Sequence, residues 1–160
     1  MERSARGRKG KGEFLVMAEG YKGDVDVRTC WQALAGEPDS FLVDVRTHAE
    51  WSYVGLPDLQ AIGRAPVLIE WQSYPSMAVA PDFAARLAEA VTQAGGSTQS
   101  SLYFLCRSGV RSIAGAVAAT RAGFANSYNV LDGFEGPPDE QAHRGRLAGW
   151  KAAGLPWAQR

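Results

Sequence analysis

Two short runs of almost wholly apolar residues limit most strongly how this chain can fold. Residues 101–105 read SLYFL and residues 41–45 read FLVDV, with little of the polar–apolar alternation of a strand that has one wet face. Such runs are typical of parallel strands that are covered on both faces. Helical patterns at 83–94 and 112–122 flank the run at 101–105. Strands that alternate with helices predict an α/β fold with a mostly parallel sheet.

The remaining elements are shorter or less regular. Four prolines fall between residues 52 and 81, and we expect residues 52–80 to form a long irregular connection with one short strand at 67–71. The other expected elements are a strand at 14–17, a strand or helix start at 25–27, a helix at 28–35, a strand at 126–130 and a terminal helix at 144–153.

The charge of the chain is unevenly spread, although the formal net charge of the 160 residues is zero. Residues 1–12 carry five basic side chains against one acidic side chain, and the remainder carries 12 positive and 16 negative groups. We expect residues 1–12 to be a disordered basic arm and residues 13–160 to form a single domain. Because the body offers no basic face that would extend the arm, we expect no nucleic-acid partner.

Composition excludes several other classes of protein. No apolar run approaches the roughly 18 to 20 residues that span a bilayer, so we expect no membrane partner. The basic N-terminus lacks the apolar stretch of a secretory signal. Two cysteines, Cys30 and Cys106, make neither a disulfide framework nor, with two histidines, a structural zinc site. We therefore expect a cytoplasmic protein without a metal or cofactor.

Cys106 lies where the apolar run 101–105 gives way to a loop and then a helix. Ligands of open α/β sheets bind at this edge of the sheet. Backbone N–H groups around Gly109, the helix N-terminus and the guanidinium groups of Arg107 and Arg111 would all favour a thiolate over a thiol. A thiolate is the nucleophilic form of cysteine. The alternative is an inert cysteine buried at the end of a strand.

Four segments resemble the single-domain rhodanese family over roughly residues 25–157. Residues 106–111 read CRSGVR, similar to the six-residue active-site loop of that family. Residues 42–51 (LVDVRTHAEW), 129–136 (NVLDGFEG) and 149–157 (GWKAAGLPW) resemble its other signatures, in the same order. The resemblance implies a five-stranded parallel sheet with helices on both faces. The chain departs from the family at residues 54–58 (VGLPD), where the usual histidine is missing.

The resemblance implies a sulfurtransferase that moves a sulfane sulfur from a small anion such as thiosulfate to a thiol, cyanide or a protein acceptor. Cys106 would carry the sulfur as a persulfide, and Arg107 would attract the anionic donor. Arg111 would do the same or would brace the loop against an acid. The loop residues that would hold the sulfur are Arg107, Ser108, Gly109, Val110, Arg111 and Ser112.

Other residues are expected close to this loop. Asp44 and Arg46 follow another strand, so they either support the site or form an ion pair that holds two loops together, and we favour the ion pair. Trp71, Tyr74 and Met77 either line the entrance or simply pack. Cys30 lies beside an apolar helix face and is interpreted as a core residue.

Two alternatives to a turnover enzyme stay open. The domain could be a persulfide carrier that serves one partner, or a rhodanese-like module that binds a protein. A Cys-dependent phosphatase fits less well, because its loop has five residues between Cys and Arg. That spacing would require an arginine at position 112, where this chain has Ser112.

Overall fold

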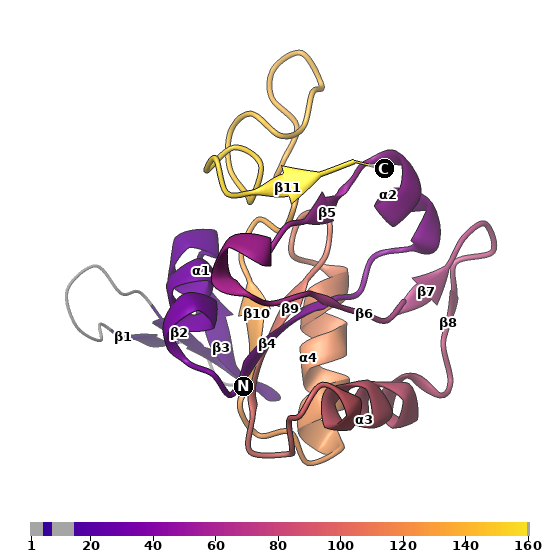
Figure 1. The fold of residues 1–160 in the computed structure, drawn as a ribbon. Helices are drawn as coiled ribbons and strands as arrows, with labels where there is room; N and C mark the ends of the chain where they lie inside the picture. The colour runs from indigo at the N-terminus through magenta and orange to yellow at the C-terminus, as the bar shows by residue number, and fades with distance from the viewer. Residues whose placement is uncertain (1–4, 8–14, 160) are drawn as a thin grey trace.

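The computed structural model describes residues 5–7 and 15–159. A seven-stranded sheet runs through the molecule in the order β1-β2-β3-β10-β9-β4-β6 (Figure 1). The five strands from β3 to β6 are parallel to one another, and β1 and β2 add an antiparallel edge. In sheet order the strands are Ala5–Gly7, Leu15–Ala18, Tyr21–Val25, Ser127–Val130, Ser101–Leu105, Ser40–Asp44 and Val67–Leu68. The five-stranded parallel sheet expected from the sequence is confirmed.

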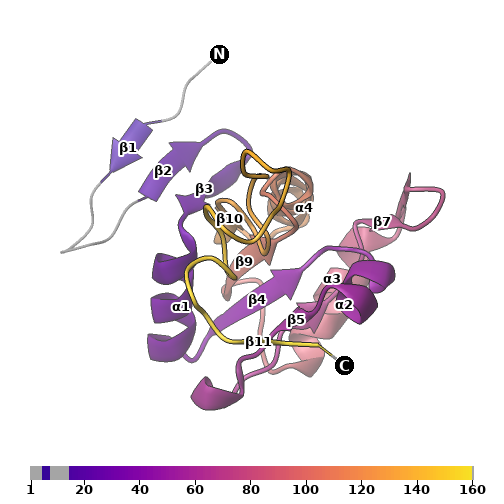
Figure 2. The same ribbon diagram turned by 90° about the horizontal axis from the view of Figure 1, so that it is seen from above.

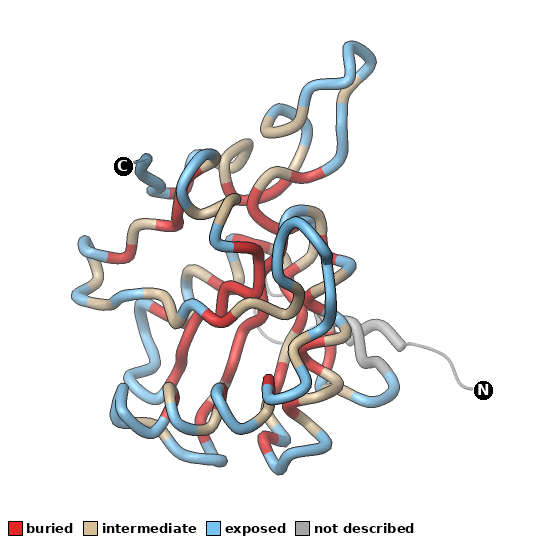
Figure 3. Tube along the Cα trace, turned by 90° about the vertical axis from the view of Figure 1, so that its right-hand side faces the viewer, coloured by how far each residue is buried: buried red, intermediate tan, exposed pale blue. Residues whose placement is uncertain are grey.

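Helices cover both faces of the sheet. Helix α1 (Val27–Gly36) lies on one face, and α3 (Phe83–Gln93) and α4 (Arg111–Arg121) lie on the other (Figures 1 and 2). Neighbouring residues of β9 show the alternation: Phe104 packs into the α3–α4 core, whereas Tyr103 and Leu105 pack into the core beside α1. Figure 3 shows the buried positions gathered along the strands between these layers. The apolar runs are therefore central strands, as their composition predicts.

Short elements fill the connection that was expected to be irregular. Helix α2 (His48–Tyr53) was not predicted; it is held by a capping box between Thr47 and Glu50. The predicted strand at 67–71 is shortened to β6. The other elements are β5 (Leu56–Pro57), the 3₁₀ turn η1 (Gln60–Ile62), the hairpin strands β7 (Gln72–Ser73) and β8 (Ala78–Val79), and β11 (Trp157–Ala158), which pairs with β5.

The predicted terminal helix at 144–153 is wrong, because this segment forms a series of turns. Its backbone bonds go to the turn after β10 instead: Trp150 N–H donates to the Gly133 carbonyl at 2.8 Å and Lys151 N–H to the Phe134 carbonyl at 3.1 Å. Gly149 adopts a φ of 98°, which a helix does not allow. The apolar residues that suggested a helix instead place Trp150 fully inside the core.

The N-terminal predictions fall mostly on positions outside the described residues. Of the arm expected to be disordered, only residues 5–7 are described, and they form β1. The strand expected at 14–17 is described from residue 15 as β2. Within the described part of the chain, none of the helices combines the length and the apolar composition needed to cross a bilayer.

Candidate functional site

Cys106 follows β9 directly and stands at the carboxyl edge of the parallel sheet, five residues before α4 begins. The neighbouring strand β4 ends beside it, where Val45 N–H donates to the Leu105 carbonyl at 2.9 Å. The thiol is almost fully buried, with 1% of the residue exposed. The structure therefore places Cys106 just after the central one of the five parallel strands, at the edge where such folds bind ligands.

Two groups, one in the loop and one in the first turn of α4, contact the sulfur. Gly109 N–H donates to Cys106 Sγ at 3.1 Å, and Ser112 Oγ lies 3.1 Å from the same atom. Gly109 has a φ of 99°, and a Cβ there would lie 3.3 Å from the backbone nitrogen of Asp132. A glycine at this position therefore lets the loop turn back over the sulfur.

The turn at residues 132–136 closes on the cysteine loop through the backbone. Phe134 N–H donates to the Cys106 carbonyl at 2.8 Å, and the N–H groups of Glu135 and Gly136 donate to the Arg107 carbonyl at 2.9 and 3.1 Å. Gly133 has a φ of 63°, and a Cβ there would meet the Cys106 carbonyl oxygen. The two segments thus touch backbone to backbone, with no room for a side chain between them.

On the other flank of the loop, Arg111 forms a bidentate ion pair with Glu50 of α2. The two N–O distances are 2.7 and 2.9 Å, and about a fifth of each side chain is exposed. Burial raises the pKa of Glu50, but hydrogen bonds from Arg111 and Thr47 outweigh it, so the net pKa lies below the ordinary value. The same hydrogen bond raises the pKa of Arg111. Arg111 therefore braces the loop against an acid, one of its two expected roles.

Asp44 and Arg46 form a fully buried ion pair at 2.7 Å. Arg46 also donates to the Gly55 carbonyl at 2.8 Å, and its guanidinium lies 4.2 Å from the centre of the Phe134 ring. The pair thus ties the end of β4 to the α2–β5 turn and to the turn at 132–136. This geometry matches the ion-pair alternative that the sequence favoured.

A line of polar contacts that sequence reasoning missed leads away from the sulfur. Ser112 Oγ donates to Asn129 Oδ1 at 2.6 Å, and Asn129 Nδ2 donates to Asp24 Oδ1 at 3.0 Å. Asn129 is 1% exposed and interrupts the otherwise apolar end of β10. A buried amide inside a strand is the signal that was available in the sequence, because buried polar groups require partners.

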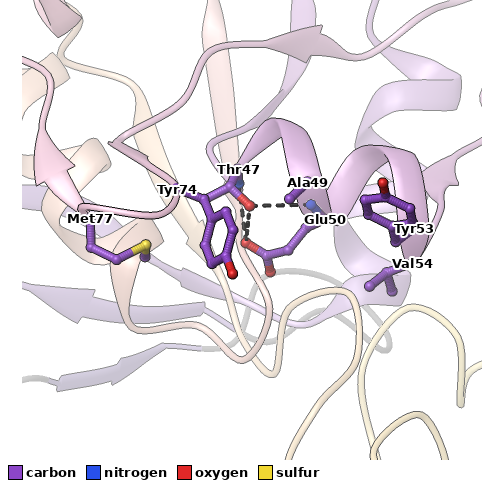
Figure 4. A pocket seen from close by; sticks show the side chains of 7 residues that line it. All are labelled: Thr47, Ala49, Glu50, Tyr53, Val54, Tyr74 and Met77. Atoms are coloured by element: carbon purple, nitrogen blue, oxygen red, sulfur yellow. Dashed lines mark hydrogen bonds between the residues drawn. The ribbon is translucent and has the colours of Figure 1, made fainter.

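An apolar pocket of about 430 Å³ opens beside the ion pair, between α2 and the β7–β8 hairpin. Figure 4 shows Tyr74 and Met77 on one side and Tyr53 and Val54 on the other, with the Thr47–Glu50 capping box between them. Tyr74 and Met77 thus line a pocket on the Glu50 side of the cysteine loop. Trp71 instead packs edge-on against Phe83, with ring centroids 5.0 Å apart.

The other candidate residues divide between the surface and the core. Arg107 and Val110 are exposed and Ser108 is half-buried. Cys30 is fully buried, and burial raises the pKa of its thiol strongly, with the Asp26 charge adding to this effect. Cys30 is therefore a core residue. Among the described residues, no group of three or more His, Cys, Asp or Glu side chains is arranged to hold a metal ion.

Two sequence comparisons identify relatives of this chain. The model of the family described as the STR4 middle domain matches residues 22–160. An uncharacterized protein of Rickettsia conorii is 35% identical over 127 residues, which is 79% of this chain and 89% of that protein.

Two solved structures share the architecture. Rv0390 from M. tuberculosis superposes with a TM-score of 0.77 at 43% identity, covering 88% of this chain and 99% of that one. The polysulfide-sulfur transferase homodimer of Wolinella succinogenes superposes with a TM-score of 0.55 at 20% identity, covering 86% of this chain and 78% of that one. The fold expected from the sequence, a five-stranded parallel sheet with helices on both faces, is therefore shared with solved proteins.

Proposed function

The chain belongs to the STR4 middle domain family, and from that premise we propose that it is a sulfurtransferase that carries a sulfane sulfur as a persulfide on Cys106. The observation that supports this most directly is the setting of the sulfur. It lies at the carboxyl edge of the central strand, accepts the Gly109 N–H at 3.1 Å, and precedes the N-terminus of α4. The shared fold with a polysulfide-sulfur transferase agrees with this activity.

The proposed reaction has two displacements. The Cys106 thiolate attacks the outer sulfur of thiosulfate, so that a new S–S bond forms and the bond to the sulfite sulfur breaks, with its electron pair leaving on sulfite. The enzyme then holds a persulfide whose outer sulfur carries the negative charge. An acceptor nucleophile attacks that outer sulfur, and the electron pair of the S–S bond returns to Cys106 as a thiolate.

The charges around the loop suit anionic sulfur. Arg107 is exposed at the mouth and can attract a donor anion. Arg111 lies close enough for the Cys106 charge to contribute to its raised pKa, after the larger effect of Glu50. The N-terminus of α4 adds partial positive charge. Together these groups favour negative charge on the outer sulfur of the persulfide.

The pocket between α2 and the β7–β8 hairpin suits the apolar part of a sulfur acceptor. Its charged lining residue, Glu50, is already paired with Arg111 of the cysteine loop. A volume of about 430 Å³ falls in the range of small-molecule sites. We therefore expect thiols with an apolar or aromatic body to be better acceptors than small polar thiols.

The second candidate is a persulfide carrier that hands its sulfur to a protein. Val110 in the loop is 73% exposed and Ile113 on α4 is 38% exposed. Apolar side chains at the rim serve no purpose for a small anion, whereas a docked protein would cover them. Such a carrier would load the same persulfide but would turn over slowly with small acceptors.

Intact mass after incubation with thiosulfate tests the proposal. Wild type is expected to gain one sulfur, about 32 Da, and to lose it when cyanide is added. Cys106→Ser, a nearly isosteric change, is expected to gain nothing while keeping its melting temperature, whereas Cys30→Ser is expected to load normally. Loading of Cys106→Ser would overturn the role of Cys106. If neither thiosulfate nor polysulfide loads the wild type, the sulfurtransferase is ruled out and the remaining alternative is a module that binds a protein.

A further inference from the structure

The polar line behind Cys106 crosses three elements of the fold. It begins at the sulfur, passes through Ser112 at the start of α4 and Asn129 on β10, and reaches Asp24 on β3, which is directly opposite Asn129 in the sheet register. Tyr21 donates to the same Asp24 oxygen at 2.9 Å. Cys106, Ser112 and Asn129 are at most 1% exposed. Asp24 and Tyr21 are half-buried.

The direction of these hydrogen bonds follows from the chemistry of Asp24. A carboxylate only accepts, so Asn129 must turn its amide nitrogen toward Asp24 and its carbonyl oxygen toward Ser112. Ser112 has one hydroxyl proton, and the 2.6 Å contact assigns it to that oxygen. Ser112 therefore presents a lone pair, not a proton, to the sulfur 3.1 Å away.

At Ser112 this arrangement suits a thiol, whereas a thiolate keeps the Gly109 N–H as a donor but gains none from the hydroxyl. A protonated Cys106 can donate its S–H to the Ser112 lone pair. A thiolate would compete with Asn129 for the single hydroxyl proton, because both are acceptors. Were the amide reversed, Asn129 would donate to Ser112 and free that proton for the sulfur, but its carbonyl would then face the Asp24 carboxylate. The charge on Asp24 opposes that reversal.

The other charged groups around the line are paired with each other, exposed to solvent or far from it. Arg111 is paired with Glu50, and Asp44 is paired with Arg46. Arg107, in the loop itself, is exposed to solvent. At Asp24 itself, the titratable group in contact is the Tyr21 phenol, which donates to the carboxylate. Arg121, the other charged residue of α4, lies at the far end of that helix from Ser112.

We propose that Asp24 is a positioning residue that acts through Asn129 and Ser112 to hold the unloaded Cys106 as a thiol. This inference rests on the proposed function only because it takes Cys106 as the reacting sulfur. Replacing Asp24 by an amide removes the preference for one orientation of Asn129. The Ser112 hydroxyl is then free to turn to the sulfur, and the thiolate gains a donor.

Alkylation of Cys106 by iodoacetamide across a range of pH tests this inference, since only the thiolate reacts. Asp24→Asn is expected to react about fivefold faster at neutral pH, with the midpoint of its pH–rate curve moved to lower pH. Asp26→Asn is the matched control. It removes the same charge two residues away, leaves a good N-cap on α1, and is expected to keep the wild-type curve.

A double-mutant cycle separates the hydrogen-bonded line from simple loss of a charge. If Asp24 acts through the hydroxyl, the effect of Asp24→Asn disappears in a Ser112→Ala background and persists in Ser112→Thr, which keeps a hydroxyl. If the effect survives Ser112→Ala, or if Asp26→Asn reproduces it, the inference is overturned. Should Ser112→Ala fail to fold, Asn129→Leu breaks the same line one link further on.

These readouts are independent of sulfur loading. A protein that fails to load sulfur but shows the Ser112-dependent shift loses the proposed function and keeps this inference. If the protein loads sulfur but shows no such shift, the proposed function stands and this inference is overturned.

Discussion

The cysteine loop is fastened in different ways on its two flanks. Toward the turn at residues 132–136, three backbone N–H groups bond to two backbone carbonyls of the loop at 2.8 to 3.1 Å. Toward α2, the loop is held by the Arg111–Glu50 ion pair, whose side chains are about one-fifth exposed. One flank depends on main-chain shape and the other on side-chain charge.

The difference shows which flank can adjust. Backbone bonds between buried segments are insensitive to pH and to salt, and they break only when a segment changes shape. A partly exposed ion pair weakens as salt rises and when its acid takes up a proton. The pocket lies on this adjustable flank, so the acceptor side of the site is expected to respond to conditions that leave the sulfur itself in place.

Gly133→Ala should have the largest effect, because it attacks the rigid flank. The residue has a φ of 63°, and a Cβ would collide with backbone atoms of Cys106 and Arg107. We expect a loss of about 3 kcal/mol or more in the free energy of unfolding, measured by urea denaturation. Gly63→Ala is the control: its φ is 69° but nothing lies within 4 Å of the new Cβ. Equal losses in both variants would show that the turn does not press on the loop.

Glu50→Gln should have a smaller effect on the adjustable flank. It removes the acid opposite Arg111 while keeping the shape of the side chain. We expect a loss of about 1 kcal/mol in the free energy of unfolding and slower loading from thiosulfate. Glu89→Gln, on the exposed side of α3, is expected to change neither. If Glu50→Gln were as stable as the wild type in low salt, the ion pair would not be what holds this flank of the loop.

The ion pair also predicts a pH window. Because the pKa of folded Glu50 lies below its ordinary value of 4.5, the stabilisation is fully present above that value and is lost as the pH falls through the folded pKa. The difference in unfolding free energy between wild type and Glu50→Gln should therefore be constant near neutral pH and shrink in acid. A difference that grows in acid would mean that the pair is not the stabilising contact.

Tyr74→Ala should be the mildest change. Tyr74 is 68% exposed, so its removal should alter the unfolding free energy by less than about 0.5 kcal/mol. We expect KM for an aromatic thiol acceptor to rise several-fold, with the rate for cyanide unchanged. Val79→Ala, on the same hairpin and also exposed, is the control. An unchanged KM in Tyr74→Ala would show that the acceptor does not bind in this pocket.

What the sequence predicted well depends on local pattern. The apolar runs of β9 and β4 and the small-residue helix α4 each carry their signal within about ten residues, and together they place Cys106 correctly. Helix α2 was missed although Thr47 and Glu50 have the spacing of a capping box, because the six-residue helix has no long apolar stripe.

What the sequence did not predict depends on contacts between distant residues. The terminal segment was interpreted as a helix because its apolar spacing resembles one, whereas its backbone bonds go to the turn at 132–136. The alignment of Asn129 with Asp24 arises from the register between two strands that are about a hundred positions apart in the chain. A single sequence does not show which residues of two distant strands lie opposite each other.

The pairing of β11 with β5 has a practical consequence for anything joined to the end of this domain. Trp157 lies opposite Pro57, and the Lys151 ammonium lies 4.0 Å from the Trp157 ring. The Gln159 side chain donates to the Tyr53 and Val54 carbonyls at 3.3 Å, and Figure 1 shows the C-terminus beside α2. A protein fused there would be tethered beside α2, the helix whose Glu50 is paired with the cysteine loop, and so at a raised effective concentration near that loop. A fusion at this end therefore offers a direct way to present a chosen sulfur acceptor to Cys106.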